Sequence, residues 1–598
     1  MLNYPAFRND LKIIIILFNL ILSSLLPAQT PGVTSISPAF NEIASTINPQ
    51  ISVAFNVPMD SSTFNYLSFS VLGERSGYHT GQISFSGNNT VVSFSSNTKY
   101  NSGEPVKVTL SHKIKSLQGD TLEGFAWEFR IPSKPTAINF SRPVSYGGGG
   151  FGLQCIDMNN DGYPDIVTSS GVIRINDGKG NLPTAWVLND ADGFAPIIVD
   201  DFNRDGFMDV VYRGSDGLKI GLGDGKGNFK ITTKPFWFGS YISADLNNDG
   251  YPDIAGTMGS EGDTSKSYLK WGISFNDGSG NFNDTVMYKV SDGGLPINII
   301  SADVDNDGNT DVIIVSAPAP SGTFYPYGIN GLIVCINDGK GNFDKTGLYS
   351  LRHVQAFDQS NLYMADFNND GYIDISDMDY RGEILLNHKD GTFSEDTSYM
   401  RTIWGAEDFV SMTGGDINGD GLIDIIISGY SFPLLPDMPV IYYTVLKNDD
   451  SYFMPPAQIN FSDSLPRSSY SVAAADLNGD GYLDIVHSGS GVFVTLHSDT
   501  ITSVKNNPAQ VNNFKLYQNY PNPFNPSTTI EYQLNRESKI TISVYNILGE
   551  KLKELYSGIK PGGKYKTIFN ASGLPSGIYL IAIETPFGYR VQKSIYLK

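Results

Sequence analysis

Short apolar runs that alternate with polar residues recur along the chain after about residue 30. Gly, Asn, Asp and Pro bound these runs, and such residues are typical of turns between strands. β-Branched stretches such as Asp-Ile-Val (165–167) and Asp-Ile-Ile-Ile (424–427) come directly after acidic turns. The pattern predicts an all-β protein built from many short strands.

One nine-residue motif is repeated seven times within this pattern. In every copy the first, fifth and ninth positions are Asp and the sixth is Gly, while the third is Asn in six copies and Asp305 in the other. The copies begin 44 to 63 residues apart, an interval that fits one four-stranded propeller blade. They start at Asp157, Asp201, Asp245, Asp303, Asp366, Asp416 and Asp476.

A second turn follows most copies of the motif, with forms such as NDGKGNL from Asn176 and NDGKGNF from Asn337. Clusters of Asn, Asp and Gly between apolar runs indicate hairpins. The predicted unit is strand, acidic loop, strand, connection, strand, Gly-rich turn and strand. The seventh unit lacks its last turn, so we expect segment 137–146 to supply the missing outer strand and close a ring of seven blades.

The spacing of oxygen donors in the motif fits a hard cation. Ca²⁺ takes six to eight oxygen ligands, and glycine permits the sharp turn that brings alternate side chains together. We expect side-chain ligands at positions one, three, five and nine and a backbone carbonyl at position seven. The predicted metal ligands are Asp157, Asn159, Asp161, Tyr163, Asp165, Asp201, Asn203, Asp205, Phe207, Asp209, Asp245, Asn247, Asp249, Tyr251, Asp253, Asp303, Asp305, Asp307, Asn309, Asp311, Asp366, Asn368, Asp370, Tyr372, Asp374, Asp416, Asn418, Asp420, Leu422, Asp424, Asp476, Asn478, Asp480, Tyr482 and Asp484.

Two other interpretations of the motif are weaker. An EF-hand needs Glu at position twelve and flanking helices, and none of the seven copies has that Glu. Plain Asx-turns without metal explain one loop better than seven loops with the same carboxylate positions. We therefore expect up to seven Ca²⁺ ions.

The N-terminus and the composition indicate an exported chain. Arg8 and Lys12 precede an apolar run over 13–26 and a small-residue site near Ala28, which predicts a secretory signal peptide over 1–28. The apolar run is too short for a membrane anchor, and we expect no transmembrane segment in the mature chain. The net charge of −21 argues against nucleic acid as a partner. Cys155 and Cys335 occupy different positions in the repeat and predict two buried thiols without a bridge.

The seven motifs with their Gly-rich turns resemble the FG-GAP or VCBS repeats of bacterial surface proteins and of the integrin α-subunit. That resemblance covers about 136–500 and implies a seven-bladed β-propeller with Ca²⁺ between the first and second strands of each blade. It does not imply an enzyme.

The flanking regions resemble two further families. The pattern SISPAFNEIASTINPQISVAFNVPMD (35–60) is similar to a bacterial Ig-like sandwich over 31–133. LYQNYPNPFNPSTTIEYQL (516–534) and the later Gly577-Ile-Tyr579 resemble the type A sorting domain of type IX secretion substrates over 513–598, after a linker over 501–512. That resemblance implies a β-sandwich, handling by the type IX secretion machinery, and a secreted or cell-surface location in a Bacteroidetes-like envelope.

Three functions remain open at this point. The first is a binding or adhesion module for a glycan or extracellular protein, with a ligand face opposite the acidic loops, where aromatic residues stack on the ligand. The candidate ligand-face residues are Phe324, Tyr325, Tyr327, Tyr430 and Phe432. The alternatives are a polysaccharide lyase or glycoside hydrolase and a structural part of a surface assembly. We expect no catalytic residues, because no zinc or P-loop motif is present and His353, His388 and His487 are scattered. The glycines at 147, 149 and 152 match a dinucleotide-binding pattern that no predicted helix follows.

Overall fold

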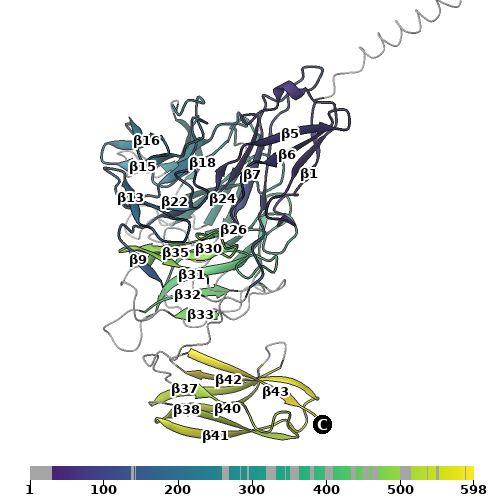
Figure 1. Cartoon of the computed structure of the whole chain (residues 1–598), viewed down its shortest axis with the longest axis vertical. Helices are drawn as coiled ribbons and strands as arrows, with labels where there is room; N and C mark the ends of the chain where they lie inside the picture. The colour runs from purple at the N-terminus through teal and green to yellow at the C-terminus, as the bar shows by residue number, and fades with distance from the viewer. Residues whose placement is uncertain are drawn as a thin grey trace, which may run out of the picture. The chain divides into compact units, whose positions relative to one another are not determined.

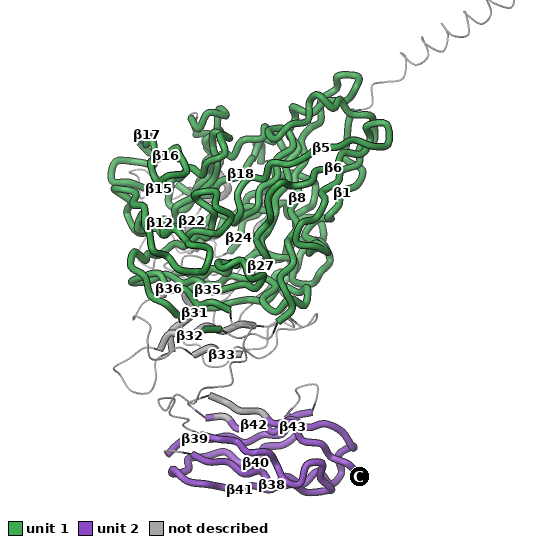
Figure 2. The backbone as a smooth tube through the Cα atoms, in the orientation of Figure 1, with its two compact units in different colours: residues 1–499 green, residues 500–598 purple. Residues whose placement is uncertain are grey.

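The described part of the chain is built almost entirely of β-strands (Figure 1). Its one helical element is a 3₁₀ turn, η1 (Ser61–Thr63). The chain forms two compact units, residues 1–499 and 500–598 (Figure 2). This computed structural model describes residues 30–598 except 137–139, 142, 237, 259–267, 283–284, 293–294, 318–330, 344, 351–361, 378–382, 397–407, 432–439, 447, 449–456, 461–468, 498–513, 535–536, 547–550 and 586–587.

The first unit begins with a sandwich of two antiparallel sheets. Alternating burial along Ile51–Phe55 turns every second side chain into the space between the sheets. Trp127, Phe129 and Phe69 are among its largest fully buried side chains, and burying each such side chain stabilises the fold by about 1.5–3 kcal/mol. The sheets are β1 (Val33–Ser37), β2 (Ile51–Phe55), β6 (Val91–Ser96), β5 (Gly81–Ser86), and β4 (Gly77–Tyr78), β3 (Phe69–Gly73), β7 (Pro105–Leu110), β8 (Phe125–Arg130).

The rest of the first unit contains seven four-stranded antiparallel sheets in its described part. We number them sheets 1 to 7 in chain order. They are β10 (Leu153–Ile156), β11 (Asp165–Thr168), β12 (Val172–Ile175), β13 (Thr184–Val187); β14 (Ile198–Asp200), β15 (Asp209–Gly214), β16 (Gly217–Gly223), β17 (Phe229–Lys234); β18 (Tyr241–Ala244), β19 (Asp253–Met258), β20 (Tyr268–Ser274), β21 (Val286–Asp292); β22 (Leu295–Ala302), β23 (Asp311–Ala317), β24 (Gly331–Ile336), β25 (Lys345–Ser350); β26 (Leu362–Ala365), β27 (Asp374–Asp377), β28 (Glu383–Asn387), β29 (Phe393–Asp396); β30 (Asp408–Gly415), β31 (Asp424–Ser431), β32 (Val440–Leu446), β33 (Ala457–Asn460); and β34 (Ser469–Ala475), β35 (Asp484–Gly489), β36 (Val492–Thr495), β9 (Val144–Tyr146).

Sheet 7 takes its outer strand from the start of this region. β9 pairs antiparallel with β36, with Val144 opposite Val494 and Tyr146 opposite Val492. The predicted pairing of segment 137–146 with the last sheet is therefore confirmed. Because the pairing joins both ends of the repeat region, no long edge of sheet 7 is left open.

Apolar clusters fill the space between neighbouring sheets all the way around the ring. Between sheets 1 and 2, Ile156 and Val167 pack with Val199 and Val210. Between sheets 7 and 1, a separate cluster contains Cys155, Ile166, Leu477, Val486 and Val494. This closed arrangement is that of a β-propeller, and the predicted all-β class is confirmed.

The two cysteines lie in different clusters. Cys155 lies between sheets 7 and 1, and Cys335 lies between sheets 3 and 4. Both are buried and free, as predicted. Burial raises the pKa of each thiol to about 12, so both stay protonated at neutral pH.

The second unit is a sandwich with its own core. Phe524, Ile542, Phe569 and Tyr579 are buried between its sheets. β38 begins directly after Pro526, where the proline-rich entry ends. The sheets are β37 (Phe514–Leu516), β38 (Ser527–Leu534), β41 (Gly563–Asn570), and β40 (Lys551–Lys560), β39 (Ser538–Tyr545), β42 (Gly577–Thr585), β43 (Gly588–Tyr596).

Candidate metal centres on the hairpin loops

Each copy of the repeated motif forms the loop between the first and second strands of one sheet. We call these loops 1 to 7 after their sheets. In loop 1 the carboxylate of Asp157 accepts the backbone N–H of Asp161 at 3.1 Å and that of Gly162 at 2.7 Å. The same two bonds recur in the other six loops. The first aspartate therefore folds the loop around itself.

The ninth aspartate ties the loop to the Gly-rich turn. Asp165 accepts the N–H of Met158 at 3.0 Å on one oxygen and the N–H of Asn176 at 2.8 Å on the other. Equivalent pairs of bonds occur in the remaining loops, and in sheet 7, which lacks a Gly-rich turn, the second donor is the N–H of His497. Backbone N–H groups thus hold each ninth-position carboxylate in one orientation, which preorganises it as a ligand.

Two residues in each loop have left-handed backbone conformations. The sixth-position glycines have φ between +87° and +95°, a conformation that side chains rarely adopt. The fourth position has φ between +55° and +71° and is Asn in four loops, since Asn tolerates this region better than most residues. Loops 6 and 7 have Gly at position four, and loop 2 has Arg204.

Burial raises the pKa of the carboxylic acids that line the loops. The ninth-position side chains are fully buried, and burial raises the pKa of Asp165 to about 8 and that of Asp311 to about 9. Burial also raises the pKa of Asp157 at position one to about 6. Within the described residues, no lysine or arginine forms an ion pair with a first- or ninth-position aspartate. Buried carboxylates need a compensating cation to stay ionised.

Loop 4 brings three carboxylates together. Oxygens of Asp303, Asp305 and Asp311 all lie within 4.8 Å of one another. In the other loops the third position is Asn, which offers a neutral oxygen in place of a third carboxylate. Carboxylate and amide oxygens are the donors that Ca²⁺ and Mg²⁺ prefer, so the residues present fit the predicted metal.

The candidate ligand-face residues lie almost entirely outside the described residues. The structure does not describe Phe324, Tyr325, Tyr327 or Phe432. Of Tyr430, in β31, it describes only the backbone. The connections that carry them do join the second and third strands of sheets 4 and 6, as predicted. They therefore leave the sheets at the end opposite the hairpin loops, because neighbouring strands are antiparallel.

The histidines and the glycine-rich segment have structural surroundings where they are described. His487 is fully buried, its ring stacks on Phe493 at 4.5 Å, and burial lowers its pKa to about 3. His388 is exposed, and His353 lies outside the described residues. Residues 147–152 connect β9 to β10 without a helix, so the dinucleotide-binding pattern has no structural basis here.

One set of recurring residues was not singled out from the sequence. The first Asn of five Gly-rich turns donates its side-chain amide to the carbonyl of the second loop residue in the preceding sheet. Asn176 of sheet 1 reaches Leu477 of sheet 7 at 2.7 Å, across the closure of the ring. These donors are Asn176, Asn276, Asn337, Asn387 and Asn448. The recurrence of Asn at the first position of these turns is the sequence feature that could have identified them.

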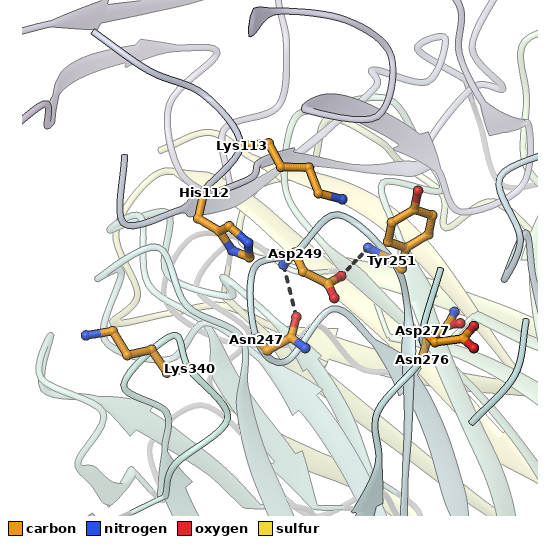
Figure 3. A pocket seen from close by; sticks show the side chains of 8 residues that line it. All are labelled: His112, Lys113, Asn247, Asp249, Tyr251, Asn276, Asp277 and Lys340. Atoms are coloured by element: carbon orange, nitrogen blue, oxygen red, sulfur yellow. Dashed lines mark hydrogen bonds between the residues drawn. The ribbon is translucent and has the colours of Figure 1, made fainter. Parts of the chain in front are cut away.

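The N-terminal sandwich lies against the hairpin loops. The backbone N–H of His112 donates to the carbonyl of Asn248 in loop 3 at 3.1 Å, and Lys113 lies over the ring of Tyr251 at 4.4 Å. Figure 3 shows these sandwich side chains above loop 3. A polar pocket of about 440 Å³ remains there, lined by His112, Lys113, Asn247, Asp249, Tyr251, Asn276, Asp277 and Lys340.

Comparison with protein families confirms the three predicted resemblances. Residues 157–212, 201–256 and 245–314 match FG-GAP-like repeats, and residues 468–486 match the FG-GAP repeat. Residues 27–131 match a bacterial Ig-like domain, and residues 518–597 match the secretion system C-terminal sorting domain. The sorting domain indicates type IX secretion to the cell surface or the extracellular space. Within the described residues, no helix has the length and apolar character to cross a membrane.

Similarity to individual proteins is distant. The chain is 25% identical to mouse (Mus musculus) phosphatidylinositol-glycan-specific phospholipase D over 196 residues, which are 32% of this chain and 21% of that protein. A quinoprotein alcohol dehydrogenase-like protein from Bacteroides thetaiotaomicron aligns over 73% of this chain and 97% of its own, with 10% identity and a TM-score of 0.31. Quinohemoprotein alcohol dehydrogenase from Comamonas testosteroni aligns over 72% and 76%, with 9% identity and a TM-score of 0.32. Neither structural similarity informs on function.

Proposed function

We propose that this secreted or surface protein is a calcium-stabilised seven-bladed propeller that binds a glycan or an extracellular protein. The observation that carries the proposal is the sevenfold recurrence of one buried, preorganised carboxylate loop. An active site is normally built once, whereas a structural metal site can serve every blade.

The metal would be held by the side chains at positions one, three, five and nine and the carbonyl at position seven of each loop. When bound, Ca²⁺ supplies the positive charge that keeps the buried carboxylates ionised. The residues of each loop orient those carboxylates through the backbone N–H bonds described above. The loops therefore serve stability, and binding is expected elsewhere on the ring.

The face opposite the loops is the proposed ligand surface. The hairpin face is contacted by the N-terminal sandwich, whereas the three longest connections between second and third strands leave the opposite end of their sheets. The connection after β23 carries Tyr325 and Tyr327, and Tyr430 lies near the end of β31, just before the connection that follows it. Aromatic rings suit stacking on sugar rings or peptide side chains.

An array of glycans and matrix proteins, probed with the full secreted chain in Ca²⁺ and in chelator, tests this function. We expect binding in Ca²⁺ that falls when Tyr325, Tyr327 and Tyr430 are replaced together by Ala. Matched replacement of Tyr520, an exposed tyrosine of the second unit, should leave binding unchanged. Unchanged binding by the triple variant would place the ligand site elsewhere.

A test for cleavage of polysaccharides distinguishes the enzymatic alternative from the binding proposal. The phospholipase activity named for the mouse relative is not proposed here, because the match spans about a fifth of that protein. Incubation with a panel of polysaccharides, with and without Ca²⁺, should give no new reducing ends or unsaturated products. Product formation would replace the binding proposal with a lyase or hydrolase.

A further inference from the structure

The N-terminal sandwich and the segment that follows it contact every one of the seven loops. At least one bond joins each loop to residues 41–136, and the seven bonds named next have donor–acceptor distances of 2.6–3.1 Å. In loop order the pairs are Arg75 with Asp157, Ser70 with Arg204, His112 with Asn248, Ala126 with Gly308, Asn41 with Gly371, Thr136 with Asn418 and Lys134 with Gly481.

Most of these contacts are made to the backbone of the loops. Sandwich or linker donors reach the carbonyls of Gly308, Gly371 and Gly481, which are sixth-position residues with φ near +90°. A carbonyl in this position points in a direction set by the loop's left-handed turn. Docking therefore depends on the loop conformation more than on the loop's side chains.

Partly buried polar contacts reinforce the docked arrangement. Lys107 of β7 donates to Thr310 Oγ1 at 2.8 Å, next to the ninth-position Asp311. Arg204 of loop 2 donates to Ser70 Oγ at 3.0 Å and lies 3.7 Å from the centre of the Tyr78 ring. Asn248 at position four of loop 3 is 1% exposed, because the sandwich covers it. Separation of the two parts would expose these groups.

From this geometry we infer that the hairpin face of the ring is the docking surface for the N-terminal sandwich, and that cation binding in the loops holds the sandwich in place. The inference rests on the proposed occupancy of the loops by Ca²⁺. Without the cation, the acidic side chains of a loop lose the shared ligand that draws them together, which loosens the turn that presents the docking carbonyls. By linkage, docking strengthens cation binding by the same factor.

Hydrogen exchange of the full chain in Ca²⁺ and in EGTA tests the inference. The amides of His112, Ala126 and Lys134 donate to loop carbonyls, so we expect their exchange to accelerate by about tenfold or more in EGTA, within the usual range for coupled sites. The amide of Leu122 bonds to Ile114 inside the sandwich and is the matched control, with unchanged protection.

A direct measurement of bound Ca²⁺ in the same samples distinguishes failure of the calcium proposal from failure of the coupling between Ca²⁺ binding and docking. If no Ca²⁺ binds, both the proposed function and this inference are wrong. If Ca²⁺ binds and the three interface amides exchange equally in both conditions, the coupling is wrong while the calcium proposal stands.

The reverse direction is tested with the double variant Asn41→Ala and Lys107→Met, which removes contacts to loops 5 and 4. We expect about fivefold or greater weakening of Ca²⁺ binding, measured by calorimetry. Lys115→Met is the control, because that side chain is exposed on the same sandwich and makes no bond to a loop within the described residues. If the interface amides of the double variant exchange freely and the variant still binds Ca²⁺ with wild-type affinity, the coupling between docking and Ca²⁺ binding is wrong.

Discussion

Asp311 joins three parts of its sheet through one carboxylate. Its oxygens accept the N–H groups of Val304 in the hairpin loop and Asn337 in the Gly-rich turn, at 2.9 and 2.8 Å. It also lies in the three-carboxylate cluster of loop 4. We therefore expect Asp311 to contribute both to the hydrogen bonds of its sheet and to the proposed metal site.

Replacement of Asp311 by Ala should lower the apparent free energy of unfolding in Ca²⁺ by about 3 kcal/mol or more, since two buried donors lose their acceptor. Chemical denaturation of the first unit measures the change. Asp338→Ala is the matched control on the exposed Gly-rich turn of the same sheet, and we expect a change below about 1 kcal/mol. Equal effects of both substitutions would contradict the assigned role of Asp311.

His79 gives the sandwich a pH dependence of its own. Its ring nitrogens bond to the hydroxyls of Ser76 at 2.7 Å and Ser96 at 2.9 Å, and burial lowers its pKa to about 4. An unfolded histidine has a pKa of about 6.5, so the unfolded state binds more protons between pH 4 and 6.5. The contribution of neutral His79 is present above pH 6.5 and is lost as the pH falls towards 4.

We therefore expect the stability of the sandwich to fall by up to about 3 kcal/mol from pH 7 to pH 4 through this residue. In His79→Gln that part of the pH dependence should disappear. Denaturation of both proteins at a series of pH values measures the difference between them, which isolates His79 from the carboxylates. Parallel pH profiles for the two proteins would show that His79 makes no such contribution.

At the scale of elements, five of the seven sheets are held to the preceding sheet by the Gly-rich turn as well as by apolar packing. Asn337 of sheet 4 donates to the carbonyl of Leu246 in sheet 3 at 2.9 Å and to that of Thr310 in its own sheet at 2.8 Å. Sheet 2 has Gly223 at this place, where an added Cβ would lie 2.2 Å from the carbonyl oxygen of Met208. Sheet 2 therefore has no side chain at this place that could reach sheet 1.

Asn337→Ala should destabilise the first unit by about 2 kcal/mol, because two buried carbonyls lose their donor. The control is Asn342→Ala in the same turn, since Asn342 is exposed and bonds only locally to Asp338 among the described contacts. Thermal melting in Ca²⁺ measures both variants. A smaller effect for Asn337 than for Asn342 would argue against a role in joining the sheets.

At the scale of the whole molecule, the two compact units have separate cores, and the acidic loops belong to the first alone. The second unit contains no copy of the nine-residue motif. Metal and temperature are therefore expected to act on the two units independently.

We expect EGTA to lower the melting temperature of the first unit and to leave that of the second unchanged. Calorimetry of the full chain and of a chain ending at residue 499 measures this, because the shorter chain assigns the transitions. The first unit should melt at the same temperature in both chains. A chelator-insensitive first unit would exclude structural calcium.

Local features of this protein are predictable from the sequence because their partners lie close together along the chain. Asp157 and Gly162 are five residues apart, so the motif specifies the loop, its left-handed turn and its donor set. Alternating apolar positions specify the strands, and the missing last turn of the seventh unit predicted the pairing of segment 137–146 with the last sheet.

The all-β class, the sevenfold repeat, the acidic composition of each loop and the domains that flank the ring all follow from the sequence alone. Only the tertiary structure decided which face the N-terminal sandwich covers and which carbonyl each turn asparagine reaches. Asn41 and Gly371 are 330 residues apart, and the acceptor is a backbone oxygen. Every residue has such an oxygen, so no side-chain pattern marks which one will be used until the folded chain brings the donor to it.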